Sequence, residues 1–199
     1  MPDYSFETEA RQKGYKLVCG VDEAGRGPLA GPVCAAAVIL PDNCDKPGLN
    51  DSKKLTEKKR EALFDVIKEK AIAYNIAFGT VDEIEQINIL NATFLAMNRA
   101  IDGLSVKCDF ALIDGNRIPT DIKVPSKTVV KGDSKSMSVA AASVLAKVTR
   151  DRLLMEYDKQ YPEYGFKNHK GYGTREHYAA IAAHGINEIH RKSFLKGVI

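Results

Sequence analysis

The chain has 199 residues, of which 44% are hydrophobic and 28% charged, and its formal net charge is +3. This length allows one substantial core, and so small a net charge does not by itself indicate a nucleic-acid partner. No apolar run approaches the roughly 18 residues of a membrane span, and the first residues lack a signal-peptide pattern, so we expect a cytoplasmic protein with no membrane partner.

The first motif of note follows a short apolar run. Residues 1–15 are polar and predict a helical or irregular lead-in, and residues 17–21 predict a buried strand. This strand delivers Asp22 and Glu23 into a loop with three glycines, two prolines and one arginine, before a second apolar run at 32–40. No turn requires two adjacent acids, so the pair predicts a functional site. The two strands are expected to pair as a hairpin.

The next part of the chain predicts helices and strands in alternation. Thr56 is expected to cap a helix whose apolar residues share one face, and residues 74–81 predict a third strand. Asp82 with Glu85 predicts the capping box of a second long helix, which Gly103 is expected to end. This order of elements predicts an α/β domain with a mixed sheet flanked by helices.

Two further strands also end in acids. Residues 108–113 predict a strand that runs into Asp114, and a weaker strand at 128–131 is followed by Asp133. The helix predicted after it, at about 134–156, carries small residues that allow it to lie close to a sheet. Asp114 is also compatible with a plain turn, and Asp133 with a cap on that helix.

Carboxylates that are far apart in the sequence are expected to meet at one edge of this sheet, because ligand sites in open α/β sheets gather at strand ends. The acids there are Asp22, Glu23, Asp114 and Asp133. Unpaired, they would repel one another and raise one another's pKa values, so the cluster requires a cation. Oxygen ligands favour Mg²⁺ or Mn²⁺ over zinc. Such a site is typical of a two-metal phosphodiester hydrolase, with the two ions about 4 Å apart.

Other candidate motifs give weaker evidence for a site. They are the cysteines, the histidines and the glycine loop. The cysteines lack CxxC spacing and are predicted to be reduced core residues: Cys19, Cys34, Cys44 and Cys108. The histidines lack HExxH spacing, which disfavours a zinc site: His169, His177, His184 and His190. The glycine loop matches neither a P-loop nor a dinucleotide-binding fingerprint.

The C-terminal part of the chain is basic. Residues 167–199 hold two acids, Glu176 and Glu188, against these basic residues: Lys167, Lys170, Arg175, Arg191, Lys192 and Lys196. The surplus predicts either a surface that meets a polyanion or an ordinary solvated face. Composition alone does not separate the two.

Six motifs together resemble bacterial ribonuclease HII. They begin at residues 20, 50, 113, 131, 141 and 171, and read GVDEAGRGPLAGP, NDSKKL, IDG, KGD, AASVLAKVTRD and GYGT. The match runs from about residue 17 to residue 194, and the first and last motifs are highly specific in combination. The resemblance implies a ribonuclease H-like fold, a mixed five-stranded sheet flanked by helices, with a small helical C-terminal part. We expect a catalytic domain at 1–158 and a substrate-binding segment at 159–199.

The resemblance also implies an activity. Members of this family cleave RNA endonucleolytically within RNA–DNA hybrids, with Mg²⁺ or Mn²⁺, and nick duplex DNA 5′ of single embedded ribonucleotides. Cleavage is expected to leave a 3′-OH and a 5′-phosphate, with the 2′-OH acting as a recognition group and not as the nucleophile. The implied role is the removal of ribonucleotides from DNA.

Position in the motifs implies a role for each site residue. The implied metal ligands are Asp22, Glu23, Asp114 and Asp133. The loop that meets the ribonucleotide would be Gly25, Arg26 and Gly27, because a glycine backbone can approach a sugar closely and contact its 2′-OH. Tyr172 would pack on the next deoxyribose and sense the RNA-to-DNA junction, the alternative being a core tyrosine. Residues suited to phosphate positioning, or else to a solvated helix lead-in, are Asn50, Ser52 and Lys53.

Several alternatives stay open at this point. The ribonuclease HIII branch shares the acids but carries a long N-terminal domain, and residues 1–16 alone precede the first predicted strand here. A junction resolvase or transposase-like nuclease would keep the acids without requiring a 2′-OH. A non-catalytic module would bind nucleic acid through the basic tail. We expect a monomer, and a sliding-clamp partner is left open because no docking motif is evident after Phe194.

Overall fold

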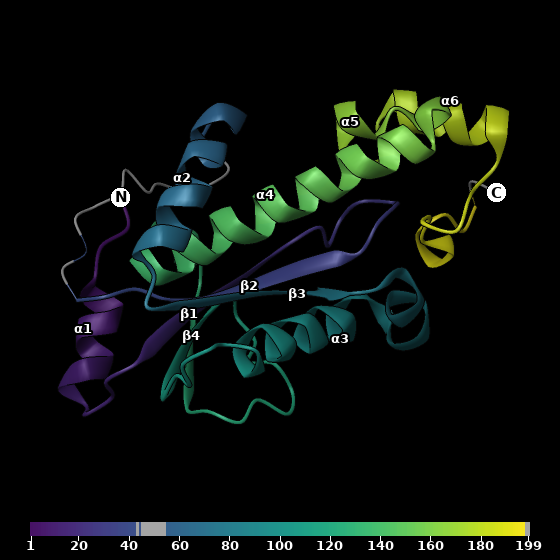
Figure 1. Ribbon diagram of the computed structural model, residues 1–199. Helices are drawn as coiled ribbons and strands as arrows, with labels where there is room; N and C mark the ends of the chain where they lie inside the picture. The colour runs from purple at the N-terminus through teal and green to yellow at the C-terminus, as the bar shows by residue number, and fades with distance from the viewer. Residues whose placement is uncertain (43, 45–54, 198–199) are drawn as a thin grey trace.

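A five-stranded mixed sheet forms the centre of the molecule (Figure 1). The structure is a computed structural model that describes residues 1–42, 44 and 55–197. The strands are β1 (Val18–Ala24), β2 (Val33–Ile39), β3 (Ala73–Gly79), β4 (Phe110–Asp114) and β5 (Ser126–Val129). They lie in the order β3-β2-β1-β4-β5, with β2 antiparallel to β1 and β3, and β4 parallel to β1 and β5. The predicted fold class and the pairing of the first two strands are confirmed.

Helices cover both faces of the sheet (Figure 1). The helices are α1 (Ser5–Gln12), α2 (Glu57–Lys70), α3 (Val81–Asp102), α4 (Met137–Gln160), α5 (Phe166–His169) and α6 (Arg175–His184). Odd-numbered residues of β2, from Val33 to Ile39, lie in the core against α3, and even-numbered residues, from Cys34 to Val38, lie in the core with α2 and α4. Because both faces are buried, β2 is a continuous apolar run and not an alternating one.

The longest helix, α4, lies very close to β1. A Cβ atom added at Gly20 of β1 would stand 2.1 Å from the carbonyl carbon of Ser138 and 2.2 Å from the nitrogen of Val139. The following turn of α4 consists of buried alanines, from Ala140 to Ala142. The predicted close approach of this helix to the sheet is confirmed.

Side-chain caps fix where several of the described helices begin. Thr56 caps α2 as predicted, its hydroxyl accepting a hydrogen bond from the amide of Lys59. The capping box predicted at Asp82 is wrong, since Thr80 and Glu83 form it and α3 begins at Val81. Ser136 caps α4 by accepting from the amide of Val139.

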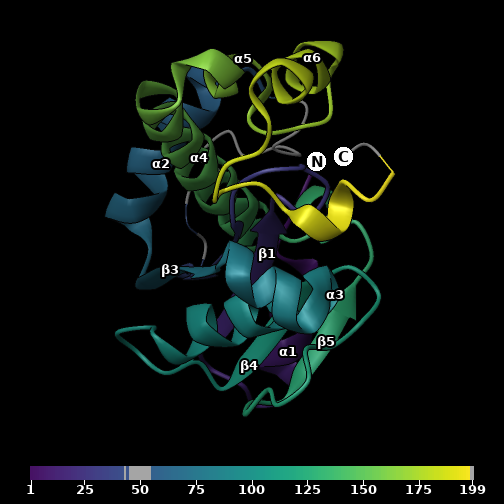
Figure 2. The ribbon, with the colours of Figure 1, turned by 90° about the vertical axis from the view of Figure 1, so that its right-hand side faces the viewer.

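The chain beyond α4 forms a small helical part with its own core. There α5, α6 and the 3-10 turns η3 (Pro162–Tyr164) and η4 (Lys192–Phe194) surround a cluster that includes Phe166, Ile181 and Leu195. Leu29 and Ala30, from the loop after β1, belong to the same cluster. Figure 2 shows this part stacked beyond one end of the sheet. Among the described helices, none has the length and hydropathy to cross a bilayer.

Candidate active site

Asp22 and Glu23 lie on β1 itself, near its end, and not in the loop beyond it. The parallel pairing of β1 with β4 places Val21 opposite Ile113, and the next residues along the two strands are Asp22 and Asp114. Three predicted site acids are therefore neighbours at the carboxyl ends of two adjacent strands. The alternative that Asp114 belongs to a plain turn is wrong, because Asp114 is the last residue of β4.

Asp22 is an acid held among other acids. Its side chain is buried, and burial, followed by the nearby charges of Glu23 and Asp114, holds its pKa well above the ordinary value. Hydrogen bonds from the Ser143 hydroxyl and from the Glu23 amide, 2.7 Å from the Asp22 Oδ1 atom, act in the opposite direction. Among the described residues, the effects that raise this pKa outweigh the hydrogen bonds that lower it, so a bound cation would stabilise the ionised form of Asp22.

The fourth acid, Asp133, directly follows a residue whose backbone amide binds Asp114. The Gly132 amide donates to the Asp114 Oδ1 atom over 2.6 Å, and Asp133 follows in the 3-10 turn η2 (Gly132–Ser134). Lys131 adopts a left-handed conformation with φ of 57°, which turns the chain from β5 toward β4. Asp133 is 5% exposed, and since Ser136 caps α4, the alternative that Asp133 caps this helix is wrong.

The four acids suit a hard divalent cation in their chemistry. All their donors are carboxylate oxygens, which Mg²⁺ and Mn²⁺ prefer. Burial, followed by the charges of Glu23 and Asp114, raises the pKa of Asp22. Within residues 1–42, 44 and 55–197, no three His, Cys, Asp or Glu side chains already surround a common point at metal-binding distance. An ion would therefore have to draw these carboxylates closer together.

The loop after β1 carries a salt bridge back to the acids. Arg26 extends to Glu23, with 3.4 Å between its Nη1 atom and the Glu23 Oε1 atom, and half of its side chain is exposed. Gly25 has a φ of +95°, a conformation that costs other residues energy. A Cβ atom at Gly27 would lie 3.8 Å from the ring of Tyr172. The structure thus brings the predicted ribonucleotide loop and the predicted junction-sensing tyrosine side by side.

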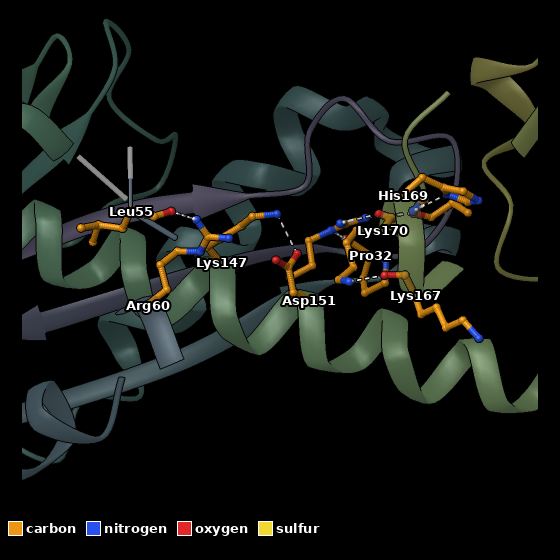
Figure 3. A network of polar contacts seen from close by, with 11 residues as sticks. Pro32, Leu55, Arg60, Lys147, Asp151, Lys167, His169 and Lys170 are labelled. Atoms are coloured by element: carbon orange, nitrogen blue, oxygen red, sulfur yellow. Dashed lines mark hydrogen bonds and ion pairs between the residues drawn. The ribbon is translucent and has the colours of Figure 1, made fainter. Parts of the chain in front are cut away.

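Tyr172 is a surface residue with 44% of its area exposed, so the alternative of a core tyrosine is wrong. The Nζ atom of Lys147 lies 5.9 Å from the centre of its ring. Lys147 also forms an ion pair of 2.7 Å with Asp151, one helical turn further along α4 (Figure 3). An exposed aromatic ring with a cation beside it is suited to packing on a sugar next to a phosphate.

A hollow of about 340 Å³ adjoins the acids. Charged and polar side chains line one part of it, and α3 supplies an apolar part. The lining residues are Glu23, Arg26, Leu90, Thr93, Phe94, Met97, Asp114, Gly115, Asn116 and Arg117. Substrate reaching Glu23 and Asp114 would meet this hollow.

The remaining predicted residues lie in varied surroundings or outside the described part of the chain. Asn50, Ser52 and Lys53 lie outside the described residues. Arg191 does not belong to a basic surface, because its side chain is fully buried. All four cysteines are free thiols, three of them buried and Cys44 half-buried.

The sequence did not predict that several polar residues near the site are buried. Ser143 and Arg150 lie on α4, and the ring nitrogens of His177 contact the Tyr172 carbonyl at 3.0 Å and His190 at 3.1 Å. These side chains bind backbone groups, or residues distant from them in the sequence. Ser143 and Arg150 belong to the motif AASVLAKVTRD, but the motif does not say which of its side chains are buried or what they contact.

Comparisons with known proteins agree with this arrangement. The sequence profile of the family described as Ribonuclease HII matches residues 19–196. A ribonuclease HII of Clostridioides difficile is 56% identical over 194 residues, which are 98% of this chain and 76% of that protein. One of Acetivibrio thermocellus is 58% identical over 98% of this chain and 75% of its own length.

A solved structure supports the same assignment. Ribonuclease H2 of Pyrococcus horikoshii superposes with a TM-score of 0.77 at 27% identity, over 92% of this chain and 97% of that one. The family profile covers most of the chain, and relatives more than half identical extend over nearly all of it. The chain therefore belongs to the ribonuclease HII family and is a hydrolase of the ribonuclease H type.

Proposed function

We propose that this protein is an endonuclease that cuts the RNA strand of RNA–DNA hybrids and nicks duplex DNA 5′ of single ribonucleotides, leaving a 3′-OH and a 5′-phosphate. The observation that carries the proposal is the placement of Gly27 beside the exposed ring of Tyr172, with the loop joined to Glu23 through Arg26. A sugar-reading surface then adjoins the acids. The role of the enzyme is the removal of ribonucleotides from DNA in the cytoplasm.

The acids at the strand ends hold the divalent cations. The ligands are Asp22, Glu23, Asp114 and Asp133. Mg²⁺ or Mn²⁺ bound there in a two-metal site supplies Lewis acidity at the scissile phosphate. Asp22 and Asp114 stand on adjacent strands of a buried sheet, so the backbone keeps the two residues adjacent before substrate binds, and their side chains close on the ion. The Gly132 amide orients Asp114 by binding its Oδ1 atom.

Selectivity for ribose lies in the loop of residues 25–27. Glycine exposes backbone amide and carbonyl groups that can contact the 2′-OH, which is the group that separates RNA from DNA. Tyr172 packs on the following deoxyribose, where a second 2′-OH would obstruct its ring. The 2′-OH thus serves as a recognition group and does not act as the nucleophile. Lys147, beside Tyr172, is placed to meet the adjoining phosphate.

Residues 159–199 act as the substrate-binding segment in this proposal, because they carry Tyr172 and exposed basic residues such as Lys167. Phosphate contacts by Asn50, Ser52 and Lys53 stay a prediction. The ribonuclease HII of Archaeoglobus fulgidus, which is 25% identical to this chain, was solved in complex with PCNA. A sliding clamp is accordingly a candidate partner of this chain as well.

The experiment is cleavage of an end-labelled DNA duplex that contains one ribonucleotide, with Mg²⁺, Mn²⁺ or EDTA. The matched substrate is the same duplex with deoxyribose at that position. We expect a single nick 5′ of the ribonucleotide with either metal, none with EDTA, and much slower cutting of the all-DNA duplex. Equal cutting of both duplexes would point to a nuclease that does not read the sugar, and the proposal would be abandoned.

A further inference from the structure

Two arginines are buried in the interior and have no part in the proposed chemistry. Arg150, on α4, is 1% exposed, and Arg191, between α6 and η4, is fully buried. Within the described part of the chain, the hydrogen bonds of both guanidinium groups go to backbone carbonyl oxygens. Burial lowers the pKa of Arg191 to about 9, which still leaves it charged at neutral pH. A buried charge is costly unless its hydrogen bonds are satisfied, so both side chains depend on these carbonyls.

Arg191 binds the loop after β1 at several points. Its Nη2 atom donates to the Gly25 carbonyl at 2.7 Å, its Nη1 atom to the Arg26 carbonyl at 3.0 Å, and its Nε atom to the Gly31 carbonyl at 2.8 Å. Its backbone amide donates to the Leu29 carbonyl at 2.8 Å. One residue thus fixes both ends of the loop.

Arg150 joins the same loop to the segment that carries Tyr172. It donates to the carbonyls of Ala30 at 2.9 Å, Pro32 at 3.0 Å and Lys170 at 3.0 Å. Figure 3 shows Pro32 and Lys170 close together beside α4. The loop and the segment therefore meet at the Arg150 guanidinium group. The segment is bound there at Lys170, two residues before Tyr172.

The backbone of both segments packs tightly at its glycines. A Cβ atom at Gly25 would lie 1.9 Å from the Arg150 Nε atom, and one at Gly171 would lie 2.7 Å from the Ala30 carbonyl oxygen. At Gly31 it would lie 3.4 Å from the Arg150 Nη2 atom. The Arg150 guanidinium occupies the space that a side chain at Gly25 would take, and the Ala30 backbone does so at Gly171, so these positions fit glycine.

The contacts also set the direction of two amides. In a trans peptide the carbonyl and the following N–H point in opposite directions, and the described chain has no cis peptide. Because the carbonyls of Gly25 and Arg26 point toward Arg191, the N–H groups of Arg26 and Gly27 point away from it. Those are amides of the loop proposed to read the 2′-OH.

We propose that Arg191 and Arg150 are positioning residues for sugar recognition: they hold the backbone of residues 25–32 in register with Tyr172, and so set the preference for ribose without touching substrate. This inference rests on the proposed function, since it takes residues 25–27 and Tyr172 as the sugar-reading groups. It assigns to the basic C-terminal part a role that its charge alone does not indicate.

The test compares Arg191→Lys, Arg191→Met and Arg150→Lys with Arg152→Met. Lysine keeps the charge but replaces the planar fork of donors by a single point. Arg152 is the matched control, an arginine on α4 with a 46% exposed side chain. The readout is the ratio of kcat/KM for the duplex with one ribonucleotide to that for the all-DNA duplex, measured with Mn²⁺ below the melting temperature of each variant.

We expect the ratio to fall about tenfold in the Arg191 and Arg150 variants, the equivalent of one lost hydrogen bond to the 2′-OH, and to stay at the parental value in Arg152→Met. A parental ratio in folded Arg191→Lys and Arg150→Lys, whatever their melting temperatures, would reduce both arginines to structural residues and overturn the inference. If Arg191→Met does not fold, the two lysine variants decide. A parent protein that does not prefer ribose overturns the proposed function together with the inference, and that result is visible before any variant is made.

Discussion

Replacing Gly20 by alanine tests whether the contact between β1 and α4 fixes the sheet that carries the acids. The added Cβ atom would stand 2.1 Å from the Ser138 carbonyl carbon and 2.2 Å from the Val139 nitrogen. Both are backbone atoms of a buried helix, so no side chain can rotate aside. Overpacking of a core typically costs about 1–3 kcal/mol. We expect the upper end, about 3 kcal/mol, which lowers the melting temperature of a chain of this size by about 10 °C.

The assay is urea unfolding followed by circular dichroism, with Gly14→Ala as the control. Gly14 has a φ of +98° and no atom within 4 Å of an added Cβ, so its substitution introduces backbone strain without a clash, at about 1 kcal/mol. Gly20 lies in an extended strand and introduces the clash alone. If Gly20→Ala loses no more stability than Gly14→Ala, then α4 can move away from β1 and the reasoning is refuted. A shifted β1 would also displace Asp22, two residues further on.

Further predictions concern charge, the sugar-reading tyrosine and pH. Asp22→Asn should abolish cleavage, leave duplex binding largely intact and raise the urea midpoint in EDTA, because it removes a carboxylate whose pKa is raised by burial and then by the charges of Glu23 and Asp114. An active or less stable variant would contradict this. Tyr172→Ala should slow cleavage at the junction, yet change the free energy of unfolding by no more than about 0.5 kcal/mol, since the residue is exposed; an unchanged rate would argue against the sugar contact. Burial lowers the pKa of His190 to about 4 from 6.5, so the unfolded chain takes up a proton there that the folded chain excludes. The corresponding stability, on the order of 3 kcal/mol, is present above pH 6.5 and is lost as pH falls toward 4, and urea midpoints across this range should drop less in His190→Asn.

The sheet and its acids were predictable because their signals are local. The apolar runs that form β1 and β4 each carry an acid near the end, and ligand sites in open α/β sheets gather at strand ends. The start of α3 was not predictable to the residue, since Thr80 and Asp82 are both good caps and the competition was decided by the bond between Thr80 and Glu83. The alternative that Asp133 caps the helix after it was open because Asp133 and Ser136 are both good caps, and the structure gives that place to Ser136.

The buried arginines show what a sequence pattern does not contain. Arg191 lies among five other basic residues in the C-terminal part of the sequence, and nothing in its neighbours distinguishes it from them. Its partners are carbonyl groups 160 to 166 residues earlier, and every residue type has such a carbonyl. A pairing with acids leaves a trace in composition, whereas a pairing with backbone does not.

The proposed chemistry and the proposed selectivity rest on two different frameworks. Asp22 and Asp114 stand on a sheet that helices cover on both faces. The loop at 25–32 is packed instead into the small C-terminal core, through Leu29 and Ala30, and is held by Arg150 and Arg191. A substitution that loosens the smaller core should therefore impair the preference for ribose before it impairs binding of the cation by the acids. Along a series of such variants, the preference for ribose should be lost first and cation binding second. In a single continuous site, both would be lost together.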